Sequence, residues 1–126
     1  MLADGNLIIA QVWTPHESNG VAETFFAEHK KVDTCAITEL NLVRFLMQKG
    51  HNGKEADRVL KSFVAQRRAD FLACDLSAVG VSTQCEGHRQ TTDTYLVMLA
   101  KKHSIKLATL DEALKSRFPD LVELVA

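Results

Sequence analysis

Four acidic residues recur at one kind of position along the chain, just after a predicted strand or in the first turn of a predicted helix: Asp4, Glu39, Asp93 and Asp111. In open α/β sheets, the carboxyl ends of parallel strands line the crevice in which ligands bind. Four carboxylates in one crevice would repel one another unless cations neutralised them, and ligation by oxygen alone suits Mg²⁺ or Mn²⁺. A site of this kind activates water and stabilises charge during phosphodiester cleavage.

Each acid also has a purely structural interpretation, in addition to the metal-site interpretation. Asp and Glu are favoured in the first turn of a helix, where they cap free N–H groups and meet the positive end of the helix dipole. Taken singly, each acid is therefore more often structural than functional. Their joint placement along the chain favours the metal site.

The positions of the acids in space depend on short strands and longer helices, which alternate along the chain. Strands are predicted at residues 1–3, 31–37, 71–74, 106–109 and 121–125. Helices are predicted at residues 6–13, from 15 to about 29, from 38 onward, from 55 to about 66, at 92–103 and at 112–116. This alternation is typical of an α/β fold, in which a mostly parallel sheet of about four to five strands is covered on both faces.

Size, charge and cysteine content narrow the class of protein. The chain has 126 residues, enough for a single domain with one core, and its 46% hydrophobic and 25% charged residues exclude a disordered tail. A net charge of −1 gives no general attraction to nucleic acid, so local basic patches or metal ions must provide it. The three cysteines show no CxxC spacing and are expected to be free thiols. With no signal peptide and no membrane span in the sequence, we expect a cytoplasmic protein.

Several familiar catalytic motifs are absent from the sequence. It contains no GxxxxGK[ST], no GxGxxG after a strand, no GxSxG and no HExxH. A phosphatase of haloacid-dehalogenase type also has an acid after its first strand, but it needs Asp-x-Asp, and position 6 is Asn. That phosphatase stays an alternative with weaker support.

The acids lie in sequence blocks that resemble a known family. The blocks are Asp4-Gly5-Asn6, Thr38-Glu39-Leu40, Thr92-Asp93-Thr94-Tyr95-Leu96 and Leu107-Ala108-Thr109-Leu110-Asp111. In order and spacing they resemble the four acidic blocks of PIN-domain ribonucleases, most of all the VapC-type toxins of toxin–antitoxin pairs. The stretch from Gly87 to Asp93 and the run Cys35-Ala36-Ile37-Thr38 resemble one VapC-like subgroup.

The resemblance implies a three-layer α/β/α PIN-like fold and a role for each matching residue. Asp4, Glu39, Asp93 and Asp111 would hold one or two Mg²⁺ or Mn²⁺ ions and cut RNA to leave a 5′-phosphate. Asn6 and Thr109 would orient these carboxylates through hydrogen bonds. Arg89, with His88, would contact the substrate phosphate, although both also fit a solvated loop. Gly5 replaces the family's more usual Thr or Val, so we expect a looser turn beside Asp4.

The resemblance also implies protein partners. Residues 7–12 and 42–47 offer more apolar surface than a small core is expected to absorb. In the family, such surfaces support a homodimer and a groove for a small antitoxin protein. A catalytically silent PIN fold that acts only as a binding module is the remaining alternative, and the presence of all four acids is an argument against it.

Overall fold

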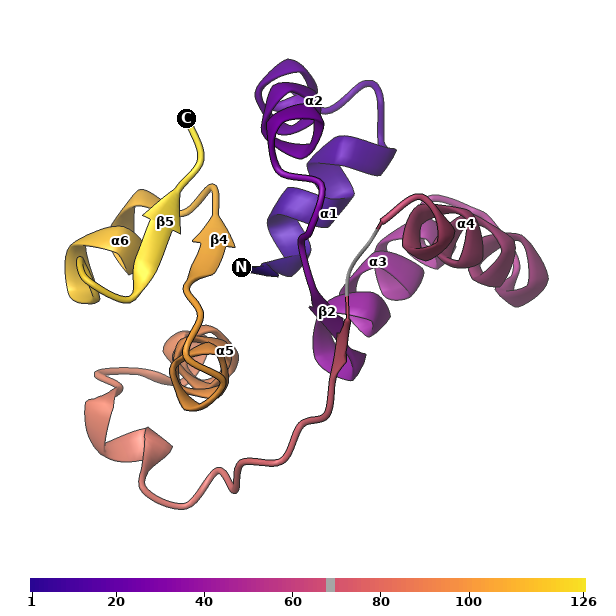
Figure 1. Cartoon of the computed structure of the whole chain (residues 1–126). Helices are drawn as coiled ribbons and strands as arrows, with labels where there is room; N and C mark the ends of the chain where they lie inside the picture. Colours follow the sequence, from indigo (N-terminus) through magenta and orange to yellow (C-terminus); the bar gives the residue numbers. More distant parts are fainter. Residues whose placement is uncertain (68–69) are drawn as a thin grey trace.

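Five short strands, all paired in parallel, form the centre of the molecule in a computed structural model that describes residues 1–67 and 70–126. The strands are β1 (Leu2–Ala3), β2 (Thr34–Cys35), β3 (Phe71–Leu72), β4 (Leu107–Thr109) and β5 (Val122–Leu124). One sheet has the order β1-β4-β5, β2 pairs with β3, and a bridge between Leu2 and Asp33 joins the two (Figure 1). The spatial order is therefore β3-β2-β1-β4-β5. The chain first adds strands on one side of β1 and then, from β4 onward, on the other side, so the switch point lies between β1 and β4. Ligands bind at such a switch point in open α/β sheets.

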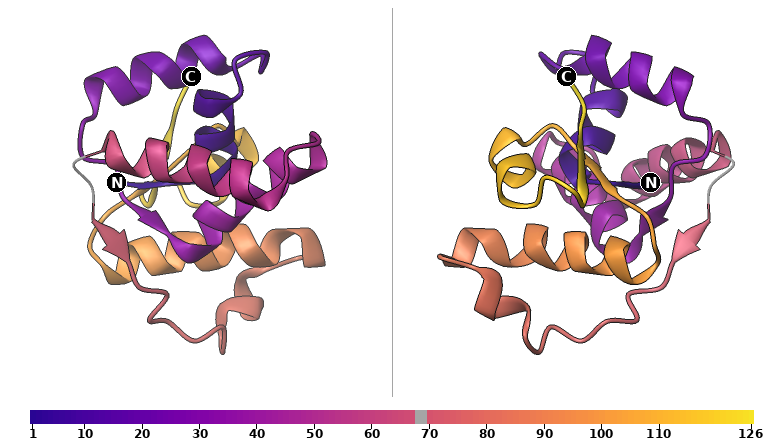
Figure 2. Two further views of the ribbon diagram at one scale, coloured as in Figure 1. Left: turned by 90° about the vertical axis from the view of Figure 1, so that its right-hand side faces the viewer. Right: turned by 60° about the vertical axis from the view of Figure 1, so that its left-hand side comes forward.

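Six α-helices and two 3₁₀ turns surround these strands in the described part of the chain. The helices are α1 (Gly5–Val12), α2 (Asn19–Glu28), α3 (Ala36–Gln48), α4 (Gly53–Ala65), α5 (Thr91–Lys102) and α6 (Glu112–Arg117). The 3₁₀ turns are η1 (Val81–Gln84) and η2 (His88–Gln90). The helices α1 to α4 cover one face of the strands, and α5 and α6 cover the other (Figure 2). This is the predicted three-layer α/β/α arrangement.

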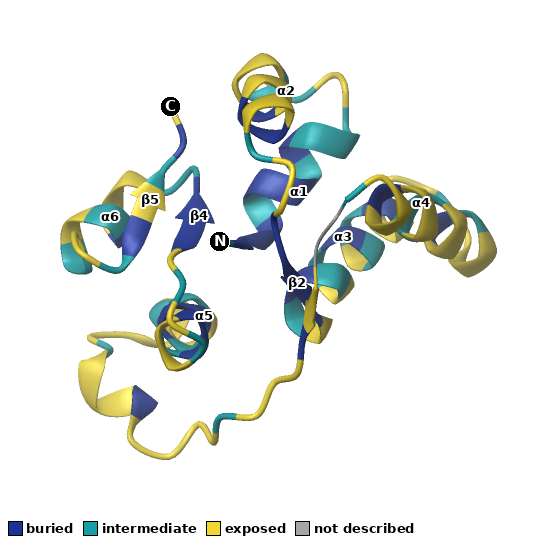
Figure 3. Ribbon diagram, in the orientation of Figure 1, coloured by how far each residue is buried: buried dark blue, intermediate teal, exposed yellow. Residues whose placement is uncertain are grey.

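The strands supply two separate cores because side chains alternate between the faces of a sheet. Leu2 and Leu107 pack with apolar residues of α5 and α6. Their neighbours Ala3 and Ala108 pack with residues of α1 to α4. Buried residues accordingly follow the strands and the inner sides of the helices (Figure 3).

The helix predicted to start at residue 15 begins only at Asn19, so the prediction of its start was wrong. Residues 14–18 form turns, in which the backbone N–H of Ser18 donates to Nδ1 of His16. The side chain of Asn19, the first residue of α2, donates to the carbonyls of Ala10 and Gln11. Those carbonyls are left free at the end of α1, so a polar residue that satisfies them fixes where the next helix starts.

The predicted strand at residues 31–37 is shorter, and the following helix starts earlier than residue 38. β2 ends at Cys35 because a capping box closes there. The Cys35 N–H donates to the hydroxyl of Thr38, and the Cys35 side chain accepts from the backbone N–H of Thr38. This reciprocal pair opens α3 at Ala36.

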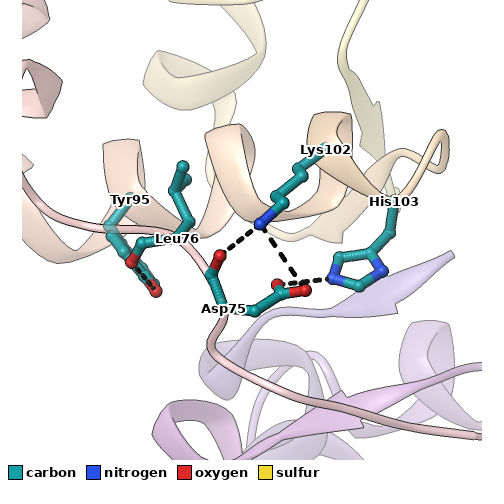
Figure 4. Close-up of polar contacts among 5 residues, drawn as sticks. All are labelled: Asp75, Leu76, Tyr95, Lys102 and His103. Atoms are coloured by element: carbon teal, nitrogen blue, oxygen red, sulfur yellow. Dashed lines mark hydrogen bonds and ion pairs between the residues drawn. The ribbon is translucent and has the colours of Figure 1, made fainter.

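A long irregular segment, residues 73–90, connects β3 to α5 and contains both 3₁₀ turns. Asp75 anchors its first part to the end of α5, where Nε2 of His103 lies 2.8 Å from Oδ1 of Asp75 and Lys102 contacts both its carboxylate and its carbonyl (Figure 4). The phenol of Tyr95 donates to the carbonyl of Leu76 at 2.7 Å. The segment is therefore held against α5 by polar contacts, although most of its residues are exposed.

Across the described residues, no helix combines the length and the apolar character needed to cross a lipid bilayer.

Candidate active site

Asp4 is the buried acid of the site. It follows β1 and caps α1, with Oδ1 accepting from the Gly5 N–H at 2.8 Å and Oδ2 accepting from the Thr109 hydroxyl at 2.7 Å. Its side chain is almost enclosed, with 5% exposure. Burial raises the pKa of Asp4 to about 6; the hydrogen bonds from Thr109 and Gly5 oppose this rise, and the charges of Asp93 and Asp111 add to it. A carboxyl group in this setting would favour a nearby cation.

Thr109, the last residue of β4, is the centre of a hydrogen-bond network around Asp4. Its oxygen accepts from Nδ2 of Asn6 at 3.1 Å and from the Asp111 N–H at 3.2 Å, while its hydroxyl donates to Asp4. The Asn6 side-chain oxygen also lies 3.4 Å from the N–H of Leu110. Thr109 thus contacts the Asp4 carboxylate directly, whereas Asn6 reaches it only through Thr109. The roles expected for both residues in orienting the acids remain predictions.

Asp111 and Asp93 approach the site from two helices. Oδ1 of Asp111 accepts from the N–H groups of Ala113 and Leu114, so this acid does cap α6, as the structural interpretation requires. Asp93 is half-buried in the first turn of α5. Burial raises its pKa, the charge of Asp111 raises it further, and the cation of Arg117 opposes the rise. The structure therefore brings three acids, Asp4, Asp93 and Asp111, within electrostatic reach of one another.

Glu39 takes a different place from the other three acids. It lies in the first turn of α3, where Oε2 accepts a 2.7 Å hydrogen bond from the hydroxyl of Thr34. The fold fixes its carboxylate at the end of β2, on the same edge of the sheet as Asp4.

Arg117 is a basic residue of the site that the sequence did not indicate. From the last turn of α6, its Nη2 donates to the hydroxyl of Thr94 at 2.9 Å and to the carbonyl of Gln84 at 2.8 Å. It therefore ties the first turn of α5, which carries Asp93, to η1. A basic residue at the end of a short helix is common for electrostatic reasons alone, so its sequence position held no functional signal.

Gly5 packs tightly, in contrast to the expected loose turn. A Cβ atom at this position would lie 2.4 Å from Nδ2 and 2.7 Å from Cβ of Asn41 on α3. Glycine therefore allows the start of α1 to approach α3 closely beside Asp4.

His88 and Arg89 form most of the turn η2, which leads directly into α5. Both side chains are exposed, and no hydrogen bond or ion pair of either side chain is present within the described residues. Their predicted contact with a substrate phosphate remains a prediction.

The donor set fits a hard divalent cation in charge and in chemistry. Asp4, Asp93 and Asp111 offer only oxygen. Burial raises the pKa of both Asp4 and Asp93, and repulsion from the neighbouring carboxylates adds to the rise. In the part of the chain that the structure describes, no three His, Cys, Asp or Glu side chains stand close enough to ligate one ion. A cation would therefore have to draw the carboxylates together.

Comparison with known proteins places the chain in a family. Ribonuclease VapC29 of Mycobacterium tuberculosis is 35% identical over 127 residues, which span 99% of this chain and 96% of the relative. The chain belongs to the VapC family of ribonucleases. Ribonuclease VapC38 of the same organism is 30% identical over 118 residues, covering 87% of this chain and 84% of that protein. No protein-family model matches the sequence. The prediction of a VapC-type, RNA-cleaving hydrolase is confirmed, and the phosphatase alternative loses its support.

A solved structure supports the fold of this VapC protein independently. The crystal structure of VapBC2 from Rickettsia felis, bound to a DNA fragment from their promoter, superimposes with a TM-score of 0.66. The match covers 98% of this chain and 96% of that chain at 14% identity, so it concerns the fold. The predicted PIN-like architecture is confirmed.

Proposed function

We propose that this VapC protein is a divalent-metal-dependent endoribonuclease that acts as the toxin of a toxin–antitoxin pair. The observation that carries the proposal is the enclosed Asp4, whose pKa is raised to about 6 by burial and by the charges of Asp93 and Asp111. Three mutually repelling carboxylates at the carboxyl edge of a parallel sheet are stabilised by a cation. An RNA substrate favours a cytoplasmic location for the enzyme.

Each residue would have a definite task in cleavage. Asp4, Asp93 and Asp111 would hold the cation, and Glu39 would complete the set from the end of β2. Mg²⁺ or Mn²⁺, when bound, supplies Lewis acidity and positive charge against the negative charge that develops on the phosphodiester. Thr109 and Asn6 would keep the Asp4 carboxylate in one orientation.

Two further contacts would position the RNA. Arg89 and His88 are exposed in the turn η2. This turn leads directly into α5, whose first turn carries Asp93. There they can neutralise a substrate phosphate, the interaction that dominates nucleic-acid affinity. The overall charge of −1 makes such local basic residues necessary.

Homodimer formation and antitoxin binding are also proposed, and α3 is the surface that supports them. The helix α1 is mostly buried, so residues 7–12 do not form the exposed apolar surface that the sequence suggested. Leu40 and Met47 on α3 are instead exposed at 64% and 49%, beside a groove of about 710 Å³ that Ile37 and Val43 also line. Exposed apolar surface of this kind marks sites of protein interaction.

An assay of RNA cleavage with and without divalent metal is the decisive experiment. Purified protein is expected to cut RNA with Mg²⁺ or Mn²⁺ and to stop in EDTA, and Asp4→Asn is expected to lose activity. Asp57→Asn is the matched control, since Asp57 is exposed on α4 and pairs with Lys61. Cleavage that persists in EDTA would exclude the metal mechanism. A wild-type protein that binds RNA without cutting it under any metal would support the silent binding module instead.

A further inference from the structure

We propose that the pocket between the 73–90 segment and α5 binds one nucleobase of the RNA beside the acidic site; this rests on the proposed function. The pocket has a volume of about 350 Å³. Its walls come from the start of α3, from the 73–90 segment with η1, and from the first turns of α5. It is separate from the carboxylates of the acidic site.

The lining of the pocket matches the chemistry of a base. Ile37 and Val81 provide apolar walls, and Tyr95 provides an aromatic ring. Ser82 and Thr92 add hydroxyl groups that make no side-chain hydrogen bond within the described residues. A nucleobase has two apolar faces and a polar edge, and proteins bind unpaired RNA bases by stacking on aromatic rings and by hydrogen bonds to that edge. An apolar side chain from a protein partner would leave the hydroxyls without a function.

The pocket adjoins the acids through two neighbours in the sequence. Thr92 directly precedes Asp93 in α5, and Ile37 shares the first turn of α3 with Glu39. The pocket and the acids therefore share the first turns of α3 and α5. From this shared position we infer that the occupant is a base of the same RNA strand whose phosphate lies at the acidic site.

Polar contacts hold the pocket in shape without a ligand. The phenol of Tyr95 is occupied by the Leu76 carbonyl, which leaves the ring itself as the surface for a base (Figure 4). Val81 is buried at 7% exposure and holds η1 against the protein. Arg117 binds the carbonyl of Gln84 at the other end of η1. Since these contacts exist beforehand, binding a base would cost little ordering of the segment.

The single tyrosine of the chain makes a direct test possible. The full-length protein, labelled with ¹³C in the ring of Tyr95, is titrated in EDTA with a short RNA oligonucleotide and with the same oligonucleotide carrying one abasic nucleotide at each position in turn. EDTA prevents metal-dependent cleavage, so this binding experiment is independent of the proposed activity. Ring resonances are expected to shift with intact RNA and to lose that shift when one particular base is missing. Shifts that are equal for intact and abasic RNA at every position would overturn the proposal.

Variants give a second, functional readout. Tyr95→Leu is expected to raise the RNA Kd by about 5-fold or more, the range for loss of one stacked base, with Tyr95→Phe affected less because it keeps the ring. Ser82→Phe fills the pocket from an exposed position and is expected to weaken binding without disturbing the core. In active protein, these variants should raise KM more than they lower kcat. If Ser82→Phe alters dimer or partner binding but leaves RNA affinity unchanged, the pocket serves a protein interface and the proposal is wrong.

Discussion

The hydroxyl of Thr109 donates a 2.7 Å hydrogen bond to Oδ2 of Asp4, across the boundary between β4 and β1. Ala3 and Ala108 are paired in register, so these two residues form the next pair along the strands. The bond therefore lies at the carboxyl edge of the sheet, where the strand order reverses. It connects the most buried acid of the site to the strand that also leads to Asp111.

Replacing Thr109 with Val should weaken both the fold and the enzyme. The change keeps the shape but removes the donor to Asp4 and the acceptor for Asn6 and Asp111. We expect a loss of about 1–3 kcal/mol in unfolding free energy, because buried polar partners are left unsatisfied. Equilibrium unfolding in urea measures this change in unfolding free energy. Thr24→Val, at an exposed hydroxyl on α2, should change stability by less than about 0.5 kcal/mol. Equal effects of the two variants would contradict the network.

Asp4 should make metal-free protein less stable as the pH rises. Its pKa is about 6 in the folded protein against 3.8 for the unfolded chain. Between these values the folded state binds more protons, so stability falls from pH 4 to pH 6, by about 3 kcal/mol at most. Asp4→Asn should flatten this part of the curve. Asn has one side-chain oxygen, so it cannot accept from both the Thr109 hydroxyl and the Gly5 N–H as Asp4 does. Its net gain at pH 7 should therefore be smaller, about 1–2 kcal/mol. A curve equally steep in Asp4→Asn would assign the dependence to other groups.

Asp93→Asn separates the functional from the structural interpretation of this acid. Loss of its charge removes the cost of burying that charge and relieves repulsion with Asp111, but it also loses the attraction of Arg117. The apo protein should therefore gain only about 0.5–1 kcal/mol. Mg²⁺ should stabilise the variant less than the wild type in thermal unfolding. RNA cleavage should fall at least about 100-fold, because a ligand of the cation is lost. Near-normal cleavage in this variant would show that Asp93 does not hold a metal.

Arg117→Gln should loosen the segment beside the site. The change removes a charge and the hydrogen bonds to Thr94 and Gln84. Limited proteolysis within residues 73–90 should become faster, with a loss of about 1 kcal/mol in unfolding free energy. Arg58→Gln, at an exposed residue of α4, is the control and should behave as wild type. Unchanged proteolysis in Arg117→Gln would mean that Asp75 and Tyr95 hold the segment without it.

Local sequence patterns determined most of the secondary structure of this protein. Alternating apolar runs predicted all five strands and the helices between them, because burial of one face and capping at helix ends act over a few neighbouring residues. The same reasoning placed Asp4 directly after β1 and Asp111 two residues after the end of β4. The roles that the resemblance to PIN-domain ribonucleases implies for Asn6 and Thr109 remain predictions. Errors arose at element boundaries, where a side chain decides the end. Asn19 caps the preceding helix, and Thr38 closes β2 with Cys35.

Tertiary structure alone decided which of these groups interact. The sequence predicted three acids in one crevice and a fourth from a helix that opens there. In the fold, the charges of Asp93 and Asp111 act on Asp4, and the Glu39 carboxylate accepts a hydrogen bond from Thr34. Arg117 reaches Thr94 because α6 packs near the start of α5, although the two residues are 23 positions apart. The Tyr95 pocket likewise needs the 73–90 segment to fold back along α5. Strand order and helix packing set these distances, and they result from the burial of the whole chain, which no local window of sequence contains.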